Sequence, residues 1–472
     1  MTAVTLTTQQ RALAINLAAK WYGSFAEIGG GQEVGRWFFR VGGAAGTVAK
    51  TISAYDMGIS DAVYGQSKRY VSRERLQSML EREYAQVADQ LRDKLGGTRC
   101  FFAFADTVAT RRFQSAERGR GWLGVRFQAE PGAEASQITV HAHLLDASAD
   151  REQEALGVLG VNLLYGAFFR CGAPQDLIAG LMDELSRERV EIDMIKFSGP
   201  AFPGIDNRLM SLELVKRGYT DAAMFTADGE VVQPSEVLYK KPILVGRGHF
   251  RPVTNLTLDI LERSRDAFLK GSGAHKEQPV ILAEMSLHNL VREPELEHAD
   301  FLARAEILGA LGFDVLISRL ERHYEIAEYL ASYTDGLIGF AVGAPSVKQL
   351  LREQFYVHLS GGVLEAIGRL FKRSVKMYIY PARDPVSGRI ETIDEMAMPE
   401  PWQHLHRLLR ELGRLELVRP TNESWLSINQ ERVLSLIQSS DASWESMVPA
   451  KVSEIIKSKR LFRPAVAGAG NE

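Results

Sequence analysis

The feature that most constrains the fold of this chain is a repeated alternation of short apolar runs with amphipathic helical patterns. The alternation is clearest after residue 241, where each apolar run is followed by a longer stretch with helical periodicity. Such a pattern is typical of strands and helices that build a parallel sheet covered by helices, so we predict an α/β fold. The strands predicted in this half cover 242–245, 280–283, 315–317, 337–342 and 375–380.

The length of 472 residues exceeds that of one ordinary domain, so we expect two or three units. In the N-terminal part the predicted strands are 99–105, 122–127 and 138–144. The predicted parts are an N-terminal α/β domain (1–172), a small connecting βαβ region (173–240), a doubly wound parallel-sheet, Rossmann-like domain (241–464) and a flexible tail (465–472).

Charge and composition exclude several classes of function. Lysine and arginine number 56 against 59 aspartate and glutamate, which gives a formal net charge of −3. A dedicated nucleic-acid or membrane-surface binder would show a basic excess, so we expect neither nucleic acid nor membrane as a partner. The longest apolar stretch, 156–169, is too short to span a bilayer and predicts a buried helix. Two cysteines without a CxxC motif, and an N-terminus without a basic or apolar leader, predict a cytoplasmic protein.

A glycine-rich turn joins the first predicted strand of the C-terminal half to the helix after it. Gly246 and Gly248 let the backbone bend and approach a ligand, while Arg247 and Arg251 add positive charge. A helix start presents unpaired N–H groups, so a strand, a glycine turn and a helix in this order can bind phosphate. A purely structural turn explains the same residues about equally well.

The turn and the helix start carry the segment G-H-F-R-P-V-T-N-L-T, residues 248–257. It resembles the G-x-F-x-P-x-H-x-G-H motif of the nicotinate and nicotinamide mononucleotide adenylyltransferases. The residues in register with the motif are Gly248, Phe250 and Pro252. The departures are Thr254 and Thr257 at the two histidines, Leu256 at the second glycine and Arg251 at an acidic position.

Later segments resemble further motifs of this family, in the family's order. Residues 340–346 are similar to its G-A-D-S turn, with proline in place of the aspartate. Residues 426–432 are similar to its I-S-S-T-x-x-R motif, with asparagine at the threonine, and 447–462 to its closing helix. The residues that keep the family's identity in the first two motifs are Gly343, Ala344, Ser346, Ser427 and Arg432.

The resemblance implies a nucleotidyltransferase-like domain that binds a mononucleotide and ATP, the latter with Mg²⁺. The family's reaction joins the mononucleotide phosphate to the α-phosphorus of ATP, and the protein aligns the groups and stabilises negative charge. Threonine hydroxyls donate only neutral hydrogen bonds, which are weaker than those of charged histidines. The expected catalytic positions are Thr254, Thr257, Arg251 and Arg432; the expected nucleotide-binding positions are Gly246, Arg247, Gly248, His249, Phe250, His288, Gly343, Ser346 and Ser427.

We therefore expect a nucleotide-binding protein related to pyridine-nucleotide (NAD) metabolism, with a degenerate adenylyltransferase site. Two alternatives stay open. One is an active adenylyltransferase that uses threonine and arginine in place of the histidines, and the other is a non-catalytic oligomeric scaffold.

Residues 26–55 begin with the small-residue loop A-E-I-G-G-G and continue with a helix, a second glycine turn and a strand. This segment resembles the start of the CinA-type nicotinamide-nucleotide amidohydrolases, whose serine nucleophile falls on Ile28. Because isoleucine has no nucleophilic atom, we do not expect deamidation by that mechanism. The resemblance leaves open a nucleotide pocket or a scaffold, and we expect the chain to form a homo-oligomer.

His141 and His143 lie two residues apart on a predicted strand and therefore project from one face. This spacing suits a metal ion, but no third ligand is apparent, so a structural role is favoured and no metal site is predicted. The charge-rich run 319–325 predicts a solvated entry to a helix.

Overall fold

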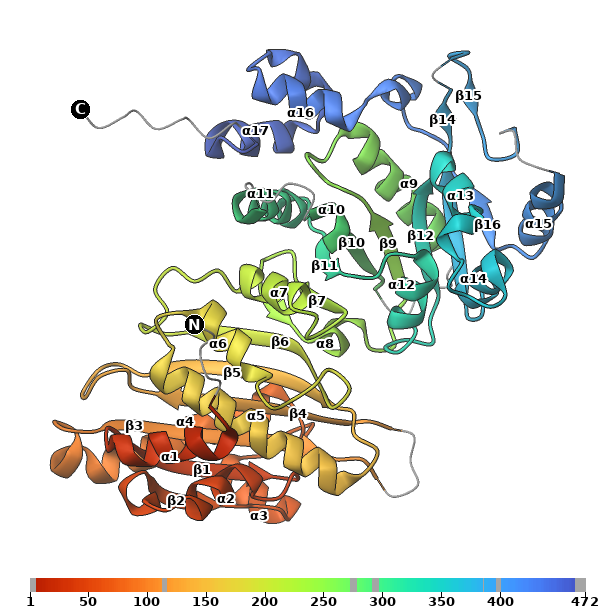
Figure 1. The fold of residues 1–472 in the computed structure, drawn as a ribbon. Helices are drawn as coiled ribbons and strands as arrows, with labels where there is room; N and C mark the ends of the chain where they lie inside the picture. The colour runs from red at the N-terminus through yellow and green to blue at the C-terminus, as the bar shows by residue number, and fades with distance from the viewer. Residues whose placement is uncertain are drawn as a thin grey trace, which may run out of the picture. The chain divides into compact units, whose positions relative to one another are not determined.

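The computed structural model describes residues 6–112, 117–271, 278–290, 297–384, 386–395 and 400–462. It divides into two compact units, residues 1–223 and 224–472, each organised around a sheet (Figure 1). The tail predicted at 465–472 lies outside the described residues.

A six-stranded sheet with the order β2-β1-β3-β4-β5-β6 organises the first unit. Its strands are β1 (Trp21–Ile28), β2 (Val48–Ile52), β3 (Cys100–Ala109), β4 (Gly119–Phe127), β5 (Ser136–Leu144) and β6 (Val190–Ser198). β1 pairs in parallel with β2 and β3, whereas β3 to β6 pair in antiparallel fashion. The connections 110–118 and 128–135 are shorter than the crossover of a dozen or more residues that a parallel pair needs. The sheet is therefore mixed, and the parallel layer that the alternating pattern suggested is limited to three strands.

Helices cover this sheet and supply much of its core. They are α1 (Thr8–Ala18), α2 (Glu33–Arg40), α3 (Met57–Tyr64), α4 (Arg73–Leu95), α5 (Ala149–Phe169), α6 (Pro174–Leu181) and α7 (Asn207–Lys216). α5 contains the apolar stretch 156–169, and most of its residues are buried, as predicted. Its contact with α2 requires glycine, because a Cβ on Gly160 would lie 2.3 Å from Cγ2 of Val34.

The second unit has an eight-stranded sheet with the order β16-β13-β12-β9-β10-β11-β7-β8. Its strands are β7 (Ala222–Phe225), β8 (Val231–Val232), β9 (Ile243–Arg247), β10 (Val280–Ser286), β11 (Asp314–Ser318), β12 (Ile338–Gly343), β13 (Val375–Tyr380) and β16 (Leu415–Leu417). The six strands from β16 to β11 in this order are parallel to their neighbours. Numbered along the chain from β9, they follow the doubly wound order 3-2-1-4-5-6. The predicted doubly wound parallel sheet is confirmed.

Helices alternate with these strands. They are α8 (Pro234–Leu238), α9 (Asn255–Gly271), α10 (Leu287–Leu290), α11 (Glu297–Ala310), α12 (His323–Leu330), α13 (Ala344–Leu350), α14 (Gly362–Leu370), α15 (Glu400–Glu411), α16 (Gln430–Gln438) and α17 (Ala450–Lys459). A small hairpin of β14 (Ala382–Arg383) and β15 (Ile390–Glu391) follows β13. α9 begins at Asn255, and Thr254 caps its start, because the Thr254 hydroxyl accepts the backbone N–H of Thr257.

The predicted connecting region 173–240 does not form a unit of its own. Its first strand, β6, completes the sheet of the first unit, and β7 and β8 extend the sheet of the second. The boundary between the compact units lies between Ala223 and Met224. β6 pairs with β5, whereas β7 pairs with β8, so the strands of this stretch are divided between the two sheets.

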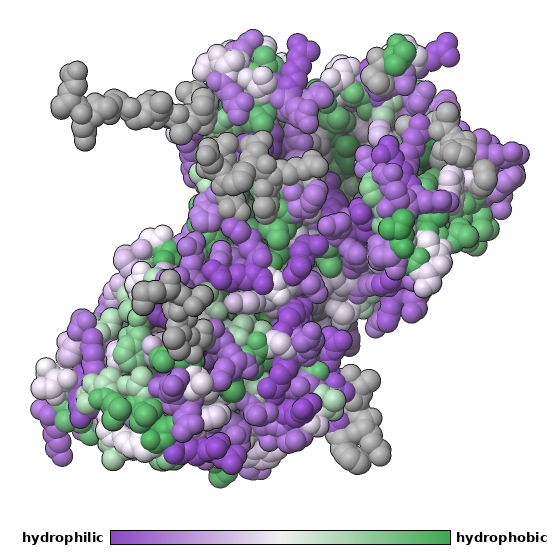
Figure 2. All heavy atoms as spheres, in the orientation of Figure 1, coloured by the Kyte–Doolittle hydropathy of each residue, from purple (hydrophilic) through white to green (hydrophobic). Residues whose placement is uncertain are grey.

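Within the described part of the chain, no helix is both long and apolar enough to cross a bilayer. On the face drawn in Figure 2, hydrophilic residues are interspersed with hydrophobic ones over both units. This mixture is ordinary for the surface of a globular protein.

Candidate functional site

The sheet of the second unit reverses its strand order between β9 and β12, which lie side by side. Chains leaving these two strands connect to opposite sides of the sheet, so a crevice forms beyond their carboxyl ends. In open α/β sheets, ligands bind at such a switch point. β9 ends in the turn at Gly246–Gly248 and β12 ends at Gly343, the two places at which the sequence predicted a nucleotide site.

A cavity of about 1040 Å³ occupies this crevice, and that volume suits a ligand of nucleotide size. The predicted site residues that line it are Gly246, Arg247, Gly248, His249, Phe250, Thr254, Thr257, His288, Gly343 and Ser346. Among the described residues, the remaining predicted positions, Arg251, Ser427 and Arg432, are not part of the lining. The cavity therefore brings together residues of three of the predicted motifs, 248–257, 340–346 and 426–432, with His288 after β10.

The end of β9 packs closely against α9. A Cβ on Gly246 would lie 2.1 Å from Cδ2 of Leu261, so the Leu261 side chain would have to shift to admit one. Thr254 is buried, and its hydroxyl accepts the backbone N–H of Thr257 at 3.2 Å and lies 3.0 Å from the Thr257 hydroxyl. Thr254 thus caps α9, and one of the N–H groups that could bind phosphate already has a partner.

Arg247 points its charge into the protein. Its Nε lies 3.0 Å from Oε2 of Glu284, a fully buried residue of β10. Its Nη1 and Nη2 donate to the backbone carbonyls of Glu321 and Leu320, the former at 2.8 Å. Burial raises the pKa of Glu284, while Arg247 and the Ser318 hydroxyl, which donates to Oε1 at 2.6 Å, lower it. The positive charge that the sequence assigned to ligand binding is largely neutralised by Glu284.

Arg251 is also paired within the protein. Its Nε lies 2.6 Å from Oδ1 of Asp300, and Arg304 binds the same carboxylate while donating from Nη1 to the carbonyl of His249 at 3.2 Å. These contacts tie the turn to α11. Arg251 therefore stabilises the turn. Its position outside the cavity lining does not fit the expected role as a catalytic charge.

Arg432 and Ser427 are exposed residues near α16. The backbone N–H of Arg432 donates to Oδ1 of Asn429 at 3.0 Å, so the residue at the family's threonine position caps α16. Other residues of the same motif, Leu426, Ile428 and Gln430, line the cavity. Alternating positions of this segment face inward, and the sequence register alone did not show which.

The charge-rich run 319–325 contributes to the cavity, in contrast to the predicted solvated helix entry. Glu321, Arg322 and His323 line it at the carboxyl end of β11, and the Arg322 guanidinium lies 4.5 Å from the centre of the Phe355 ring. Burial and the charge of Arg247 lower the pKa of His323 to about 3, so this imidazole is neutral at pH 7. The position directly after a parallel strand was the signal that could have identified these residues.

In the first unit, the carboxyl ends of β1 and β3 bring two carboxylates together. Glu27 accepts the N–H groups of Val34 at 3.0 Å and Gly35 at 2.8 Å, and Asp106, its register partner on β3, accepts that of Ile28 at 3.3 Å. Burial raises the pKa of Glu27 to about 7 and raises that of Asp106 well above its usual value, and the Glu27 charge raises the latter further. Ile28 occupies the nucleophile position of the motif that this segment resembles.

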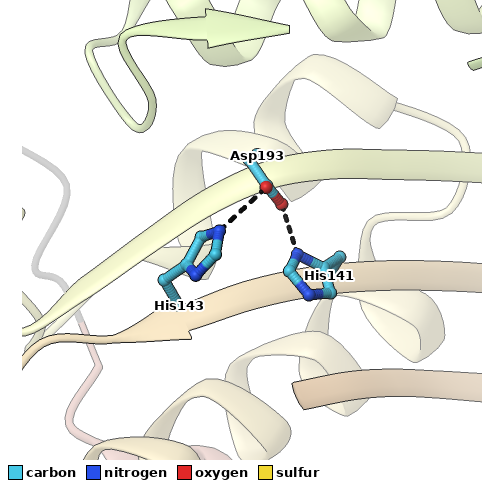
Figure 3. Close-up of side chains that lie close together, drawn as sticks. All are labelled: His141, His143 and Asp193. Carbon is cyan, nitrogen blue, oxygen red and sulfur yellow. Dashed lines mark hydrogen bonds and ion pairs between the residues drawn. The ribbon is translucent and has the colours of Figure 1, made fainter. Parts of the chain in front are cut away.

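His141 and His143 on β5 face Asp193 on β6, a third residue of a type that can ligate metal, which the sequence did not reveal (Figure 3). Nδ1 of His141 lies 2.5 Å from Oδ1 of Asp193, and Nε2 of His143 lies 3.1 Å from Oδ2. The register shifts here, because His141 pairs with Met194 and Ala142 with Ile192. Asp193 is the extra residue of this bulge, and a bulge can turn a side chain to the face that its neighbours occupy.

Comparison with known proteins gives structural matches only. No protein-family model and no curated protein sequence matches the chain. The competence/damage inducible protein CihA from Agrobacterium tumefaciens is 16% identical, with a TM-score of 0.24 over 35% of this chain and 97% of that chain. A CinA superfamily protein from Enterobacter cloacae is 12% identical, with a TM-score of 0.25 over 35% and 95%. The nicotinic acid mononucleotide adenylyltransferase of Plasmodium falciparum, complexed with APC, is 12% identical, with a TM-score of 0.28 over 47% and 97%.

Proposed function

We propose that the chain is a nucleotide-binding protein related to pyridine-nucleotide metabolism, and that its cavity in the second unit binds a mononucleotide or ATP with Mg²⁺ without efficient adenylyl transfer. The observation that carries the proposal is the cavity at the switch point between β9 and β12. Its lining includes the glycine turn after β9 and the turn after β12, two of the segments that resemble adenylyltransferase motifs.

The balance of charge around the cavity favours binding over catalysis. Adenylyl transfer needs charged donors where negative charge develops on phosphate oxygens. Here Arg247 is paired with Glu284 and Arg251 with Asp300, and His323 is neutral at pH 7. Thr254 and Thr257 offer neutral hydroxyls in place of histidines. Removing one preorganised donor costs roughly 10²- to 10³-fold in rate, so the loss of both motif histidines favours recognition over turnover.

Calorimetric titration of the full chain with ATP and Mg²⁺, and separately with nicotinate mononucleotide, tests this proposal. Thr257→Tyr places a large side chain in the cavity while leaving the backbone N–H that Thr254 caps, so it should abolish binding. Thr257→Val keeps the shape but removes the hydroxyl. If that hydroxyl donates to the ligand, affinity should fall by about 2- to 10-fold, the worth of one neutral hydrogen bond.

Arg432→Ala is the matched control, because Arg432 is exposed and outside the cavity lining. We expect it to bind as the parent chain does. The same samples, incubated with both substrates at protein concentrations near those of the substrates, should give no dinucleotide by chromatography. Absence of binding to either ligand, or unchanged binding by Thr257→Tyr, would contradict the proposed site. Dinucleotide formation would contradict the loss of catalysis.

A further inference from the structure

We propose that His141, His143 and Asp193 bind a divalent transition-metal ion such as Zn²⁺. The three residues lie in the first unit, whereas the cavity discussed above lies in the second. Metal binding and nucleotide binding can therefore succeed or fail independently of each other.

The set of donor atoms selects the class of metal. Two imidazoles and one carboxylate suit zinc and its neighbours in the transition series, whereas Mg²⁺ and Ca²⁺ prefer oxygen ligands. One ligand atom from each residue lies within 4.8 Å of the other two. Three protein ligands of this kind leave a coordination position open for water or another small ligand.

The distances are close to those of a metal site. With bonds of about 2.0–2.1 Å, ligand atoms around a tetrahedral ion lie about 3.3 Å apart. Nε2 of His143 and Oδ2 of Asp193 are 3.1 Å apart, and the 2.5 Å contact between His141 and Asp193 needs to widen by less than about 1 Å. A small rotation of either side chain supplies that change, and both imidazoles already point at the carboxylate (Figure 3).

Two of the three side chains are buried, which shields the site, and the third is partly exposed, which gives access to it. The side chains of His141 and Asp193 are 3% and 2% exposed, so a metal there would be shielded from competing water. The His143 side chain is 23% exposed and provides a path for the ion. The His141 ring packs against Trp122, with ring centres 4.8 Å apart, and this contact fixes its orientation.

A hydrogen-bonded His–Asp–His cluster is the competing explanation, and it makes different predictions. In that case both histidines only neutralise the buried carboxylate, and added metal leaves the protein unchanged. A metal site instead binds one ion per chain, and loss of any ligand weakens that binding. Removal of groups that merely support metal ligands already costs 10- to 100-fold in affinity, so loss of a ligand should cost at least about 100-fold.

The experiment uses the full chain stripped of metal with a chelator and then titrated with Zn²⁺ alone against a chromophoric competitor. We expect one Zn²⁺ per chain and a higher unfolding temperature when Zn²⁺ is added. His143→Ala should lose both effects, and it is the variant least able to disturb folding because His143 is partly exposed. His404→Ala, at an exposed histidine of α15, is the matched control and should retain both.

Co²⁺ supplies a readout that does not depend on stability. Bound at this site it should show the visible absorption of a four- or five-coordinate ion without a thiolate charge-transfer band, because the ligands include no cysteine. Asp193→Asn, which preserves shape but removes the charge, should lose this spectrum. Zn²⁺ binding that survives both His143→Ala and Asp193→Asn, or no stoichiometric Zn²⁺ binding by the parent chain, would overturn the proposal.

Discussion

The ion pair between Arg247 and Glu284 gives the sharpest prediction about the candidate site. Glu284 is fully buried, and its carboxylate contacts only the Arg247 guanidinium at 3.0 Å and the Ser318 hydroxyl at 2.6 Å among the contacts described. Arg247→Met would leave that carboxylate with one neutral partner. Breaking a buried pair in this way costs about 3–5 kcal/mol, whereas breaking an exposed pair costs about 0–1 kcal/mol.

The double variant Arg247→Met/Glu284→Gln should recover most of that loss, because it removes the buried charge together with its partner. Glutamine still accepts the Ser318 hydroxyl. We expect the free energy of unfolding of the double variant to lie within about 2 kcal/mol of that of the parent chain. This loss is less than the sum of the losses caused by the two single substitutions. Urea unfolding measures these free energies. Hydrogen exchange of peptides covering β9 and β10 assigns the loss to the second unit.

The pH dependence gives a second test of the same pair. Burial raises the pKa of Glu284, so the folded state binds this proton more tightly than the unfolded state does. Stability from this group is therefore present at low pH and is lost as pH rises through the folded pKa. Arg247→Met should raise the pKa of Glu284 further. The loss of unfolding free energy relative to the parent chain should therefore become smaller as pH falls from 8 to 5. A loss below about 1 kcal/mol at pH 8, or a deficit independent of pH, would refute the account.

Two further perturbations test the packing and charge of each unit. Because the pKa values of Glu27 and Asp106 are raised in the folded state, the free energy of unfolding should fall as pH rises from about 4.5 to about 7. Asp106→Asn imitates the protonated aspartate, so this fall should be smaller in the variant. Urea unfolding across pH 5–8 would show this, and an unchanged slope would count against it. Gly246→Ala should destabilise the second unit by about 1–3 kcal/mol, because the new Cβ would clash with Leu261. Thermal unfolding should show that the double variant Gly246→Ala/Leu261→Ala loses less stability than the sum of the losses in the two single variants.

Five strands of the second unit and its doubly wound class were predictable because the information is local. Apolar runs mark the strands, and the turns after β9 and β12 carry glycines at fixed positions. Periodicity also predicted the buried helix α5. It did not predict the antiparallel pairing in the first unit, because that depends on the length of the connections between strands.

The candidate site was harder to predict because its charges have distant partners. Arg247 follows a glycine in a turn, and nothing nearby shows that Glu284, 37 positions later, takes its charge. His141 and Asp193 are likewise separated along the chain, and a bulge that no pattern reveals turns Asp193 toward the histidines. The high charge of 319–325 predicted a solvated entry to a helix, whereas the end of β11 brings that run to the cavity.

Fold and chemistry depend on different residues in the second unit. The switch-point crevice requires apolar strands, the glycine contact with Leu261 and a cap for α9, and each of these is satisfied by residues that carry no net charge. Catalysis of adenylyl transfer requires charged donors directed at phosphate, and the two arginines of the turn are held by Glu284 and Asp300. Because a carboxylate beside each arginine lowers the local positive potential, these pairs stabilise the turn and weaken its attraction for polyphosphate at the same time. The arginine–carboxylate pairs that hold the turn therefore limit the chemistry that the crevice can perform.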